Sequence, residues 1–94
     1  MTYELEFDPR ALREWQKLGE TVKKQFKNKL QQVVQNPRIE SARLSDLPDC
    51  YKTKLKASGY RLVYQVRDSV VVVYVIAIGK REKAAVYHQA NKRL

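Results

Sequence analysis

The sequence has very few residues of the types that build metal centres and disulfide frameworks. It contains one cysteine and one histidine in 94 residues, which excludes a set of disulfide bridges and a structural zinc site made by this chain alone. Long apolar segments are also missing, since the longest run, residues 70–78, is about half as long as a membrane-spanning helix. The first residues lack the basic and apolar regions of a signal peptide. We therefore expect a small, soluble, cytoplasmic protein.

Acidic residues are scarce as well, above all in the second half of the chain. The sequence has 19 Lys and Arg against 10 Asp and Glu, a net charge of +9. Residues 52–94 contain ten bases and two acids, which accounts for +8 of that charge. The hydrophobic content of 44% is too high for a disordered basic tail, so we expect one domain over residues 1–94. The charge predicts a polyanionic partner, first of all nucleic acid, with a solvated, solubilising face as the alternative.

The first half of the chain shows a strand pattern followed by two helix patterns. Residues 3–7 alternate apolar and polar side chains, as in a half-buried strand. Asp8 and Pro9 predict an N-cap and the first helical residue, and Gly19 is placed to end that helix. A second helix is expected from residue 20 or 21 to the Asn36–Pro37 stop. We expect a helical hairpin whose Trp, Leu and Phe side chains face the core: Leu12, Trp15, Leu18, Phe26 and Leu30.

The second half changes to the period of a strand. Alternating side chains predict strands over residues 51–56 and 60–67, joined by a turn at 57–59. After another turn at 67–69, the β-branched run 70–78 predicts a central strand covered on both faces. Residues 83–93 predict a short, weakly amphipathic helix that docks loosely. The order β-α-α-β-β-β-α indicates an α+β fold, with a mainly antiparallel four-stranded sheet, the helical hairpin packed on it and a short C-terminal helix.

Cationic side chains from three segments are expected to meet near one face of this sheet. Strand alternation places Lys52, Lys54 and Lys56 on one side. Arg61 would share that face with Lys54 across the hairpin, and the next loop would bring two more cations, Lys80 and Arg81. Crowded like charges are unfavourable unless an anion lies among them. The pattern therefore predicts a phosphate site.

Such a site limits the chemistry that the chain can perform. Cleavage of RNA by the ribose 2′-OH needs a base, an acid, donors for the phosphorane charge and an in-line backbone. The one histidine, His88, is expected to be exposed on the terminal helix, and no carboxylate pair lies near the cations. Neighbouring cations favour the neutral form of a lysine such as Lys54, which makes it a candidate base. Tyr87 is either a stacking platform for a base or a packing contact that docks its helix.

Four stretches of the sequence carry a family resemblance. They are residues 8–18, the Pro-Asp-Cys-Tyr-Lys-Thr-Lys-Leu segment 48–55, the segment 58–66 with Gly-Tyr-Arg-Leu-Val-Tyr, and Gly-Lys-Arg-Glu at 79–82 followed by Val86 and Tyr87. In these stretches the chain resembles the RelE family of bacterial toxins, in the RelE/ParE superfamily, along essentially its whole length. The resemblance implies a fold like that of microbial ribonucleases and a ribosome-dependent endoribonuclease that cuts mRNA codons in the A site, leaving a 2′,3′-cyclic phosphate, without metal or other cofactor.

The resemblance also implies individual roles. Lys54 would be the general base and Arg81 the general acid, although Lys52 stays open as the base. Lys52 and Arg61 would stabilise the transition state, and Tyr87 would stack on an mRNA base. Four further cations are expected to bind RNA: Arg43, Lys56, Lys80 and Lys83. The chain departs from the family at Ser45, where a basic residue is usual, which puts one RNA contact in doubt.

Partners and alternatives follow from the same resemblance. A RelB-like antitoxin is expected to wrap the toxin, displace or lock the C-terminal helix, and bind operator DNA as part of an autorepressing complex. The ribosomal small subunit, with its rRNA and mRNA, would be the target. Two other functions stay open: a ParE-like gyrase poison, against which the combined cations argue, and a non-catalytic RNA- or ribosome-binding protein.

Overall fold

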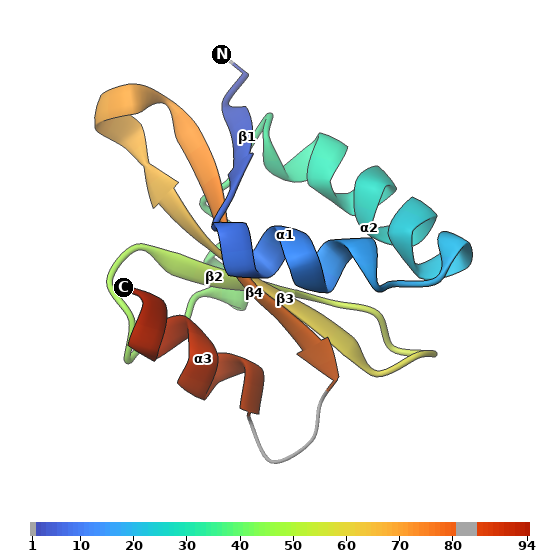
Figure 1. Ribbon diagram of the computed structural model, residues 1–94. Helices are drawn as coiled ribbons and strands as arrows, with labels where there is room; N and C mark the ends of the chain where they lie inside the picture. The colour runs from blue at the N-terminus through green and yellow to red at the C-terminus, as the bar shows by residue number, and fades with distance from the viewer. Residues whose placement is uncertain (1, 81–84) are drawn as a thin grey trace.

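A four-stranded sheet lies between two helical layers (Figure 1). The computed structural model describes residues 2–80 and 85–94. The elements in order are β1 (Glu4–Phe7), α1 (Pro9–Gln16), α2 (Glu20–Val33), the 3₁₀ turn η1 (Glu40–Ala42), β2 (Cys50–Lys54), β3 (Tyr60–Arg67), the 3₁₀ turn η2 (Asp68–Val70), β4 (Val72–Lys80) and α3 (Ala85–Arg93). None of the described helices has the length and hydropathy needed to cross a membrane.

The strand order in the sheet is β1-β4-β3-β2. The β2–β3 and β3–β4 pairs are antiparallel, and β1 pairs with β4 in parallel. The α1–α2 hairpin covers one face of the sheet and α3 covers the other (Figure 1). The predicted α+β fold with a mainly antiparallel sheet is therefore confirmed.

The beginning of α1 follows local sequence rules, and the rest of the hairpin follows them in part. The Asp8 carboxylate accepts the backbone N–H of Arg10, and Pro9 occupies the first helical position, as predicted. Gly19 is the N-cap of α2 instead of the residue that ends α1. Leu12 is 41% exposed, so the prediction that it faces the core is wrong. The stripe of α2 is confirmed, with Phe26, Leu30 and Val33 buried.

Strand β4 departs from simple alternation at both ends of its apolar run. Val70 is 61% exposed in η2, and Val71 adopts a left-handed backbone with φ 56°, so β4 begins later than predicted. The register shifts at a bulge opposite Val63 and Tyr64. The bulge places two consecutive residues, Ile76 and Ala77, against α3, where strict alternation would place one. The expectation that this strand is covered on both faces is confirmed.

Helix α3 is held more firmly than its sequence pattern predicts. Val86 and Ala90 are fully buried against the sheet. They pack with Cys50, Val63 and other residues in the hydrophobic core between α3 and the sheet. Arg93 adds an ion pair with Glu14 and a hydrogen bond to a backbone carbonyl of β4. The prediction of a loosely docked helix is therefore wrong, because two small apolar residues and one arginine provide contacts that amphipathicity alone does not reveal.

Candidate functional site

The β2–β3 hairpin brings three of the predicted cations onto the sheet face that α3 covers. Lys54 lies directly opposite Arg61, and Lys52 lies opposite Val63. Val63 packs in the core beneath α3, and alternation along each strand puts the three cations on the same side. Paired Cβ atoms in such a register lie roughly 4.5–5.5 Å apart. The predicted juxtaposition of Lys54 and Arg61 is confirmed, and we call Lys52, Lys54 and Arg61 the cation cluster.

Tyr87 joins this cluster from α3. Its side chain is half-buried, and its hydroxyl accepts a hydrogen bond of 2.8 Å from Nη1 of Arg61. A hydrogen bond from a charged donor is stronger than a neutral one, so it orients both the guanidinium and the phenol ring. The two roles left open for Tyr87 are compatible in this geometry, since the residue both docks the helix and presents its ring beside the cations.

A groove of about 580 Å³ lies between the strands, α3 and the loop before β2. Sequence reasoning identified Arg43, Lys52, Arg61 and Tyr87 among its lining residues and considered Ser45 and His88. His88 is exposed, as predicted. Sequence reasoning missed several neutral or acidic lining residues, because no motif or charge pattern marks them: Leu44, Asp46, Leu47 and Asn91.

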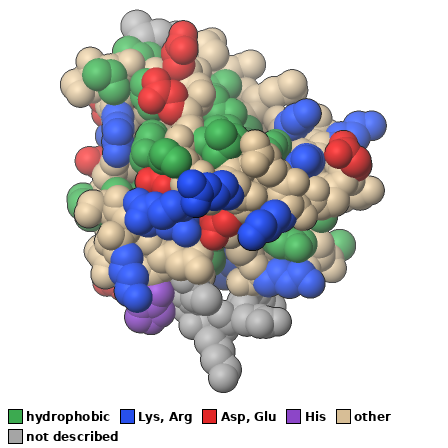
Figure 2. Space-filling view, in the orientation of Figure 1, with side chains coloured by type: hydrophobic (Ala, Val, Ile, Leu, Met, Phe, Trp, Pro, Cys, Tyr) green, Lys and Arg blue, Asp and Glu red, His purple; other side chains and the backbone are tan. Residues whose placement is uncertain are grey.

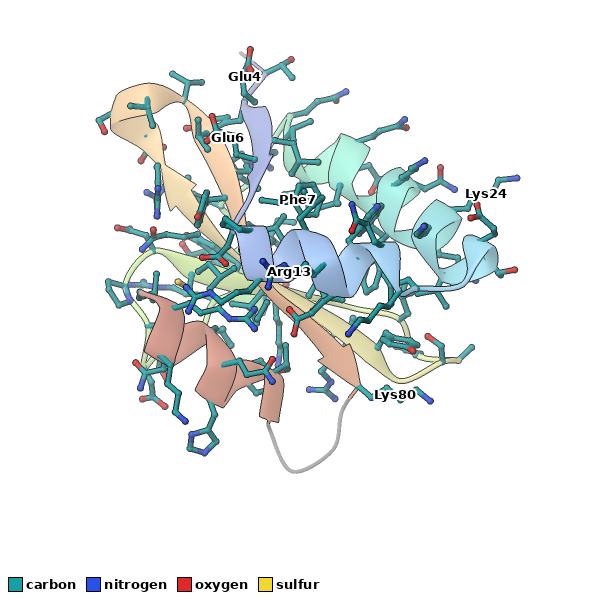
Figure 3. The ribbon with its side chains drawn as sticks, viewed as in Figure 1. Glu4, Glu6, Phe7, Arg13, Lys24 and Lys80 are labelled. Atoms are coloured by element: carbon teal, nitrogen blue, oxygen red, sulfur yellow. The ribbon has the colours of Figure 1, made fainter. Side chains whose placement is uncertain are left out.

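The remaining predicted RNA-binding residues are dispersed. Arg43 lines the groove and forms an isolated bridge with Tyr51. Lys56 is exposed in the turn after β2, which ends at residue 54. The ammonium of Lys80 lies 5.5 Å from the centroid of the Tyr60 ring, at the end of β4 (Figure 3).

The position of Lys80 corrects one prediction about the cations. Tyr60 packs with the core under α1 and α2, so Lys80 lies on the face away from the cation cluster. The prediction that it shares the face of the cluster is wrong, because the bulge in β4 shifts the alternation of that strand. Arg81 and Lys83 lie outside the described residues.

Arg38 ties down the loop that forms one wall of the groove. Its guanidinium donates to Asp49 at 3.2 Å, to the Tyr51 hydroxyl at 3.1 Å and to Asp68 at 2.6 Å. Hydrogen bonds from Tyr3 and then Arg38 lower the pKa of Asp68. Asp49 itself has a positive φ of 58°, a conformation that aspartate tolerates better than most residues. The loop between Pro37 and Cys50 is thus anchored at both ends.

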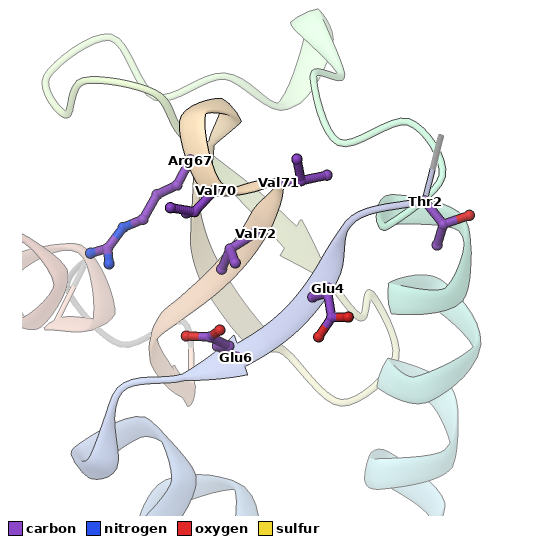
Figure 4. Close-up of a pocket in the computed structure, with 7 residues that line it drawn as sticks. All are labelled: Thr2, Glu4, Glu6, Arg67, Val70, Val71 and Val72. Carbon is purple, nitrogen blue, oxygen red and sulfur yellow. The ribbon is translucent and has the colours of Figure 1, made fainter.

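A second hollow lies at the other end of the sheet, over β1 and the start of β4. Its lining comprises Thr2, Glu4, Glu6, Arg67 and residues 70–72 (Figure 4). Acidic side chains gather over β1 in the space-filling view, while Lys and Arg lie lower on the same face (Figure 2). Carboxylates repel phosphate, so this hollow is not suited to a nucleic-acid backbone.

The chemistry available in the main groove is that of fixed positive charge. Lys52 and Arg61 line the groove and supply donors for phosphate oxygens, and arginine forms bidentate contacts with such groups. Lys54 lies opposite Arg61 on the neighbouring strand but is not one of the lining residues. Among the described residues no three His, Cys, Asp or Glu side chains are grouped as a metal site. The ring of Tyr87, whose hydroxyl accepts a hydrogen bond from Arg61, adds a surface for base stacking. The arrangement is thus suited to a single-stranded nucleic acid.

Comparison with known proteins agrees with this geometry. A family model described as the ParE toxin of the type II toxin–antitoxin system, parDE, matches residues 5–85. The mRNA interferase toxin RelE of Escherichia coli K12 is 60% identical over 94 residues, which cover all of this chain and 99% of the relative. The chain belongs to the RelE/ParE family of type II toxins.

Solved structures of the RelE/ParE family superimpose closely on this fold. An E. coli RelE mutant in the free state has a TM-score of 0.93 at 58% identity, covering 100% of this chain and 99% of that one. The toxin in the intact E. coli RelBE toxin–antitoxin complex has a TM-score of 0.84 at 60% identity, covering 86% and 99%. Both of these solved structures are of RelE toxins, so they represent the RelE branch of the RelE/ParE family.

Proposed function

We propose that the chain is a ribosome-dependent mRNA endoribonuclease, the toxin of a type II toxin–antitoxin pair, folded as one domain over residues 1–94. It cuts codons in the ribosomal A site by attack of the ribose 2′-OH and so stops translation. The full-length relatives named mRNA interferase support the activity. The observation that carries the proposal is the 2.8 Å hydrogen bond from Arg61 to Tyr87, which joins the phosphate-binding cations to a stacking ring in one groove.

Fixed cations carry the chemistry in this proposal. Lys54, or Lys52 in its place, takes the 2′-OH proton, and Arg81 gives a proton to the leaving 5′-oxygen. Lys52 and Arg61 hold the charge that develops on the phosphorane, a role that preorganised donors perform well. Tyr87 stacks on the base beside the scissile phosphate. Arg43, Lys56 and Lys83 contact rRNA or mRNA, and Lys80 does so from the face of the sheet away from the cation cluster.

The ribosome supplies what this set of groups lacks. Arginine remains charged in almost any environment, so it is a poor acid, and the described residues that line the groove include no paired His or Glu to share the work. Holding the ribose 2′-OH in line with the leaving oxygen contributes roughly 7–11 kcal/mol in well-oriented reactions. A codon held single-stranded in the A site meets that requirement, and free mRNA does not. The +9 charge draws the chain to rRNA.

A RelB-like antitoxin is the proposed partner that keeps this activity in check. Solved structures describe E. coli RelE with RelB and with an antitoxin peptide. An antitoxin that displaces α3 would remove Tyr87 from Arg61 and block access to the A site. Val86, Ala90 and Arg93 hold that helix, so the antitoxin must replace their contacts. We further propose a cytoplasmic location and autorepression through operator DNA bound by the complex.

Mapping of mRNA ends on programmed ribosomes tests the function. The wild type is expected to cut the A-site codon, while Lys54→Ala and Arg81→Ala lower the rate by roughly 10²–10⁴-fold, the range typical for a lost acid or base. Lys24→Ala is the matched control, because this exposed lysine lies on α2 away from the groove (Figure 3), and it should cut like the wild type.

Three results would contradict parts of the proposal. Equal cleavage of free mRNA would refute the dependence on the ribosome. Equal rates for Lys54→Ala and the wild type would refute the assigned base and direct attention to Lys52. Binding to ribosomes without any cleavage would indicate a non-catalytic protein.

The ParE-like gyrase poison remains the second candidate function, favoured by the ParE name of the matched family. A parallel reaction with DNA gyrase and supercoiled plasmid distinguishes the two. The proposal expects no trapped cleavage complex, and trapped gyrase combined with uncut mRNA would favour the second candidate.

A further inference from the structure

β1 pairs with only the first part of one edge of β4, and two side chains bind backbone groups along the rest of that edge. β1 pairs with Val72–Val75, and the final bond runs from the Asp8 backbone N–H to the Val75 carbonyl at 2.8 Å. Beyond this point β4 continues to Lys80, and none of the strands in residues 2–80 and 85–94 pairs with it on that side. Unpaired backbone groups at a sheet edge are unfavourable when they are buried away from water.

Glu14 of α1 and Arg93 of α3 bind these backbone groups. The backbone N–H of Ile78 donates to Oε1 of Glu14 at 3.2 Å, and Nη1 of Arg93 donates to the Ile76 carbonyl at 2.8 Å. Arg93 also donates to Glu14, from Nη1 at 2.8 Å and from Nη2 at 3.4 Å. The two side chains are only 11% and 25% exposed, Arg93 being the more buried.

Helix electrostatics point to a specific role for this pair. Glu14 lies near the C-terminal end of α1, where the helix dipole disfavours a carboxylate. Arg93 lies at the C-terminal end of α3, where the dipole favours a cation. The carboxylate of Glu14 is therefore stabilised by the Ile78 N–H and by Arg93, and not by the dipole of its own helix. The pair thus connects two helices that lie on opposite faces of the sheet (Figure 1).

This connection fixes one end of α3, and close packing fixes the other. Near its start the helix approaches β4 closely, since a Cβ placed on Gly79 would lie 3.7 Å from Cβ of Val86. Tyr87 and Arg93 are six residues apart, about 9 Å along a helix. A helix held at both ends cannot slide or rotate about its axis, so its Tyr87 hydroxyl stays at the Arg61 guanidinium.

We propose that Glu14 and Arg93 are positioning residues for the active site. They hold α3 in the place where Tyr87 meets Arg61, although neither touches the groove. This inference rests on the proposed function, because it assigns the pair an effect on mRNA cleavage. Loss of either partner lets the C-terminal end of α3 leave β4, and a shift of about 1 Å in a positioned group lowers a rate by roughly 10²-fold.

Two variants with opposite charge changes distinguish positioning from long-range electrostatics. Glu14→Gln raises the net charge by one, and Arg93→Gln lowers it by one. If only attraction to rRNA mattered, the two would change the toxin concentration at half-maximal rate in opposite directions. Positioning predicts that both lower the maximal single-turnover rate on programmed ribosomes, by roughly 10–100-fold. Arg93→Lys, which keeps one charged donor, should recover part of the rate.

A matched control and a double-mutant cycle separate positioning from loss of stability. Arg10→Gln removes the ion pair with Asp8 from the same helix as Glu14 and changes the charge as Arg93→Gln does, so it should lower the Tm without lowering the maximal rate. In a Tyr87→Ala background, Arg93→Gln should cost little more, because the pair acts through the Tyr87 side chain, its stacking ring together with the hydroxyl that meets Arg61. An undiminished effect in that background, or an equal loss of rate in Arg10→Gln, would overturn the inference.

A structural measurement keeps the inference testable if the chain does not cut mRNA at all. NMR signals of a ¹³C-labelled Tyr87 ring should shift in Glu14→Gln and Arg93→Gln and stay unchanged in Arg10→Gln. Unchanged signals in all three would refute the positioning role. Shifted signals together with inactive wild type would refute the proposed function and leave the positioning role standing.

Discussion

Replacing Asp8 by asparagine is expected to lower the free energy of unfolding by about 2 kcal/mol at neutral pH. Asp8 is 4% exposed at the start of α1. Its carboxylate accepts the Arg10 backbone N–H at 2.9 Å and the Arg10 guanidinium twice at 3.0 Å. These hydrogen bonds, chiefly the two from the Arg10 side chain, lower the pKa of Asp8 from 3.8 to about 2.

The size and the sign of the effect follow from that pKa. A difference of 3.8 − 2 = 1.8 units corresponds to about 2.4 kcal/mol at 1.36 kcal/mol per unit. The Arg10 side chain is 52% exposed, and screening by water reduces the value to about 2 kcal/mol. Because the folded pKa is lower than the unfolded one, the stabilisation is complete above about pH 4 and disappears as the pH falls towards 2. Asparagine is also a good N-cap, so the substitution removes the charge and keeps the cap.

Urea unfolding followed by circular dichroism at pH 7, 5, 4, 3 and 2.5 measures the difference in the free energy of unfolding between Asp8→Asn and the wild type. The deficit of Asp8→Asn should be about 2 kcal/mol at pH 7 and should shrink steadily below pH 4. Glu6→Gln is the matched control, because Glu6 is an exposed carboxylate of β1, and its effect should stay within about 0.5 kcal/mol. A deficit that is constant down to pH 2.5, or one that Glu6→Gln reproduces, would refute the assigned role of the charge.

Two further predictions concern buried polar groups. Tyr64→Phe should lower the free energy of unfolding, measured in urea, by about 1–2 kcal/mol, because the buried Tyr64 hydroxyl donates to the Pro37 carbonyl at 2.9 Å and its loss leaves that carbonyl unpaired. The control is Tyr60→Phe, at a half-buried tyrosine whose hydroxyl has no hydrogen bond within the described ranges, and it should cost less. Equal costs for the two variants would contradict the argument. Burial, with a smaller contribution from Asp49, raises the pKa of the Cys50 thiol to about 11. At pH 8 a thiol reagent should therefore label the native protein at least ~100-fold more slowly than the urea-unfolded chain. Equal labelling rates would show that Cys50 is accessible.

Local pattern predicted the elements wherever neighbouring residues decide the structure. The cap at Asp8, the α2 stripe and the β2–β3 hairpin all depend on residues close in sequence. Lys54 and Arg61 could be paired in advance because a tight turn at Gly59, with φ 76°, joins their strands and sets the register. The family resemblance extended this reading to roles that periodicity does not specify.

Pattern failed where distant segments decide burial. Leu12 has helical spacing but its side chain is exposed on α1, and Val70 belongs to a turn despite its β propensity. The bulge in β4 reverses the alternation that would have placed Lys80 with the cation cluster. Asp46 and Asn91 line the groove because a loop and a helix meet there, and neither residue belongs to a pattern that would have identified it.

By itself the sequence determined the α+β class, the concentration of positive charge in residues 52–94 and the pairing of cations across one hairpin, since all of these depend on composition or on short-range periodicity. The tertiary structure alone decided that α3 lies on the face of the cation cluster. It also brought Arg61 to Tyr87 and Glu14 to Arg93, pairs separated by 26 and 79 residues in the chain. Contacts over such separations arise when the whole core packs, and no local rule of the sequence encodes them.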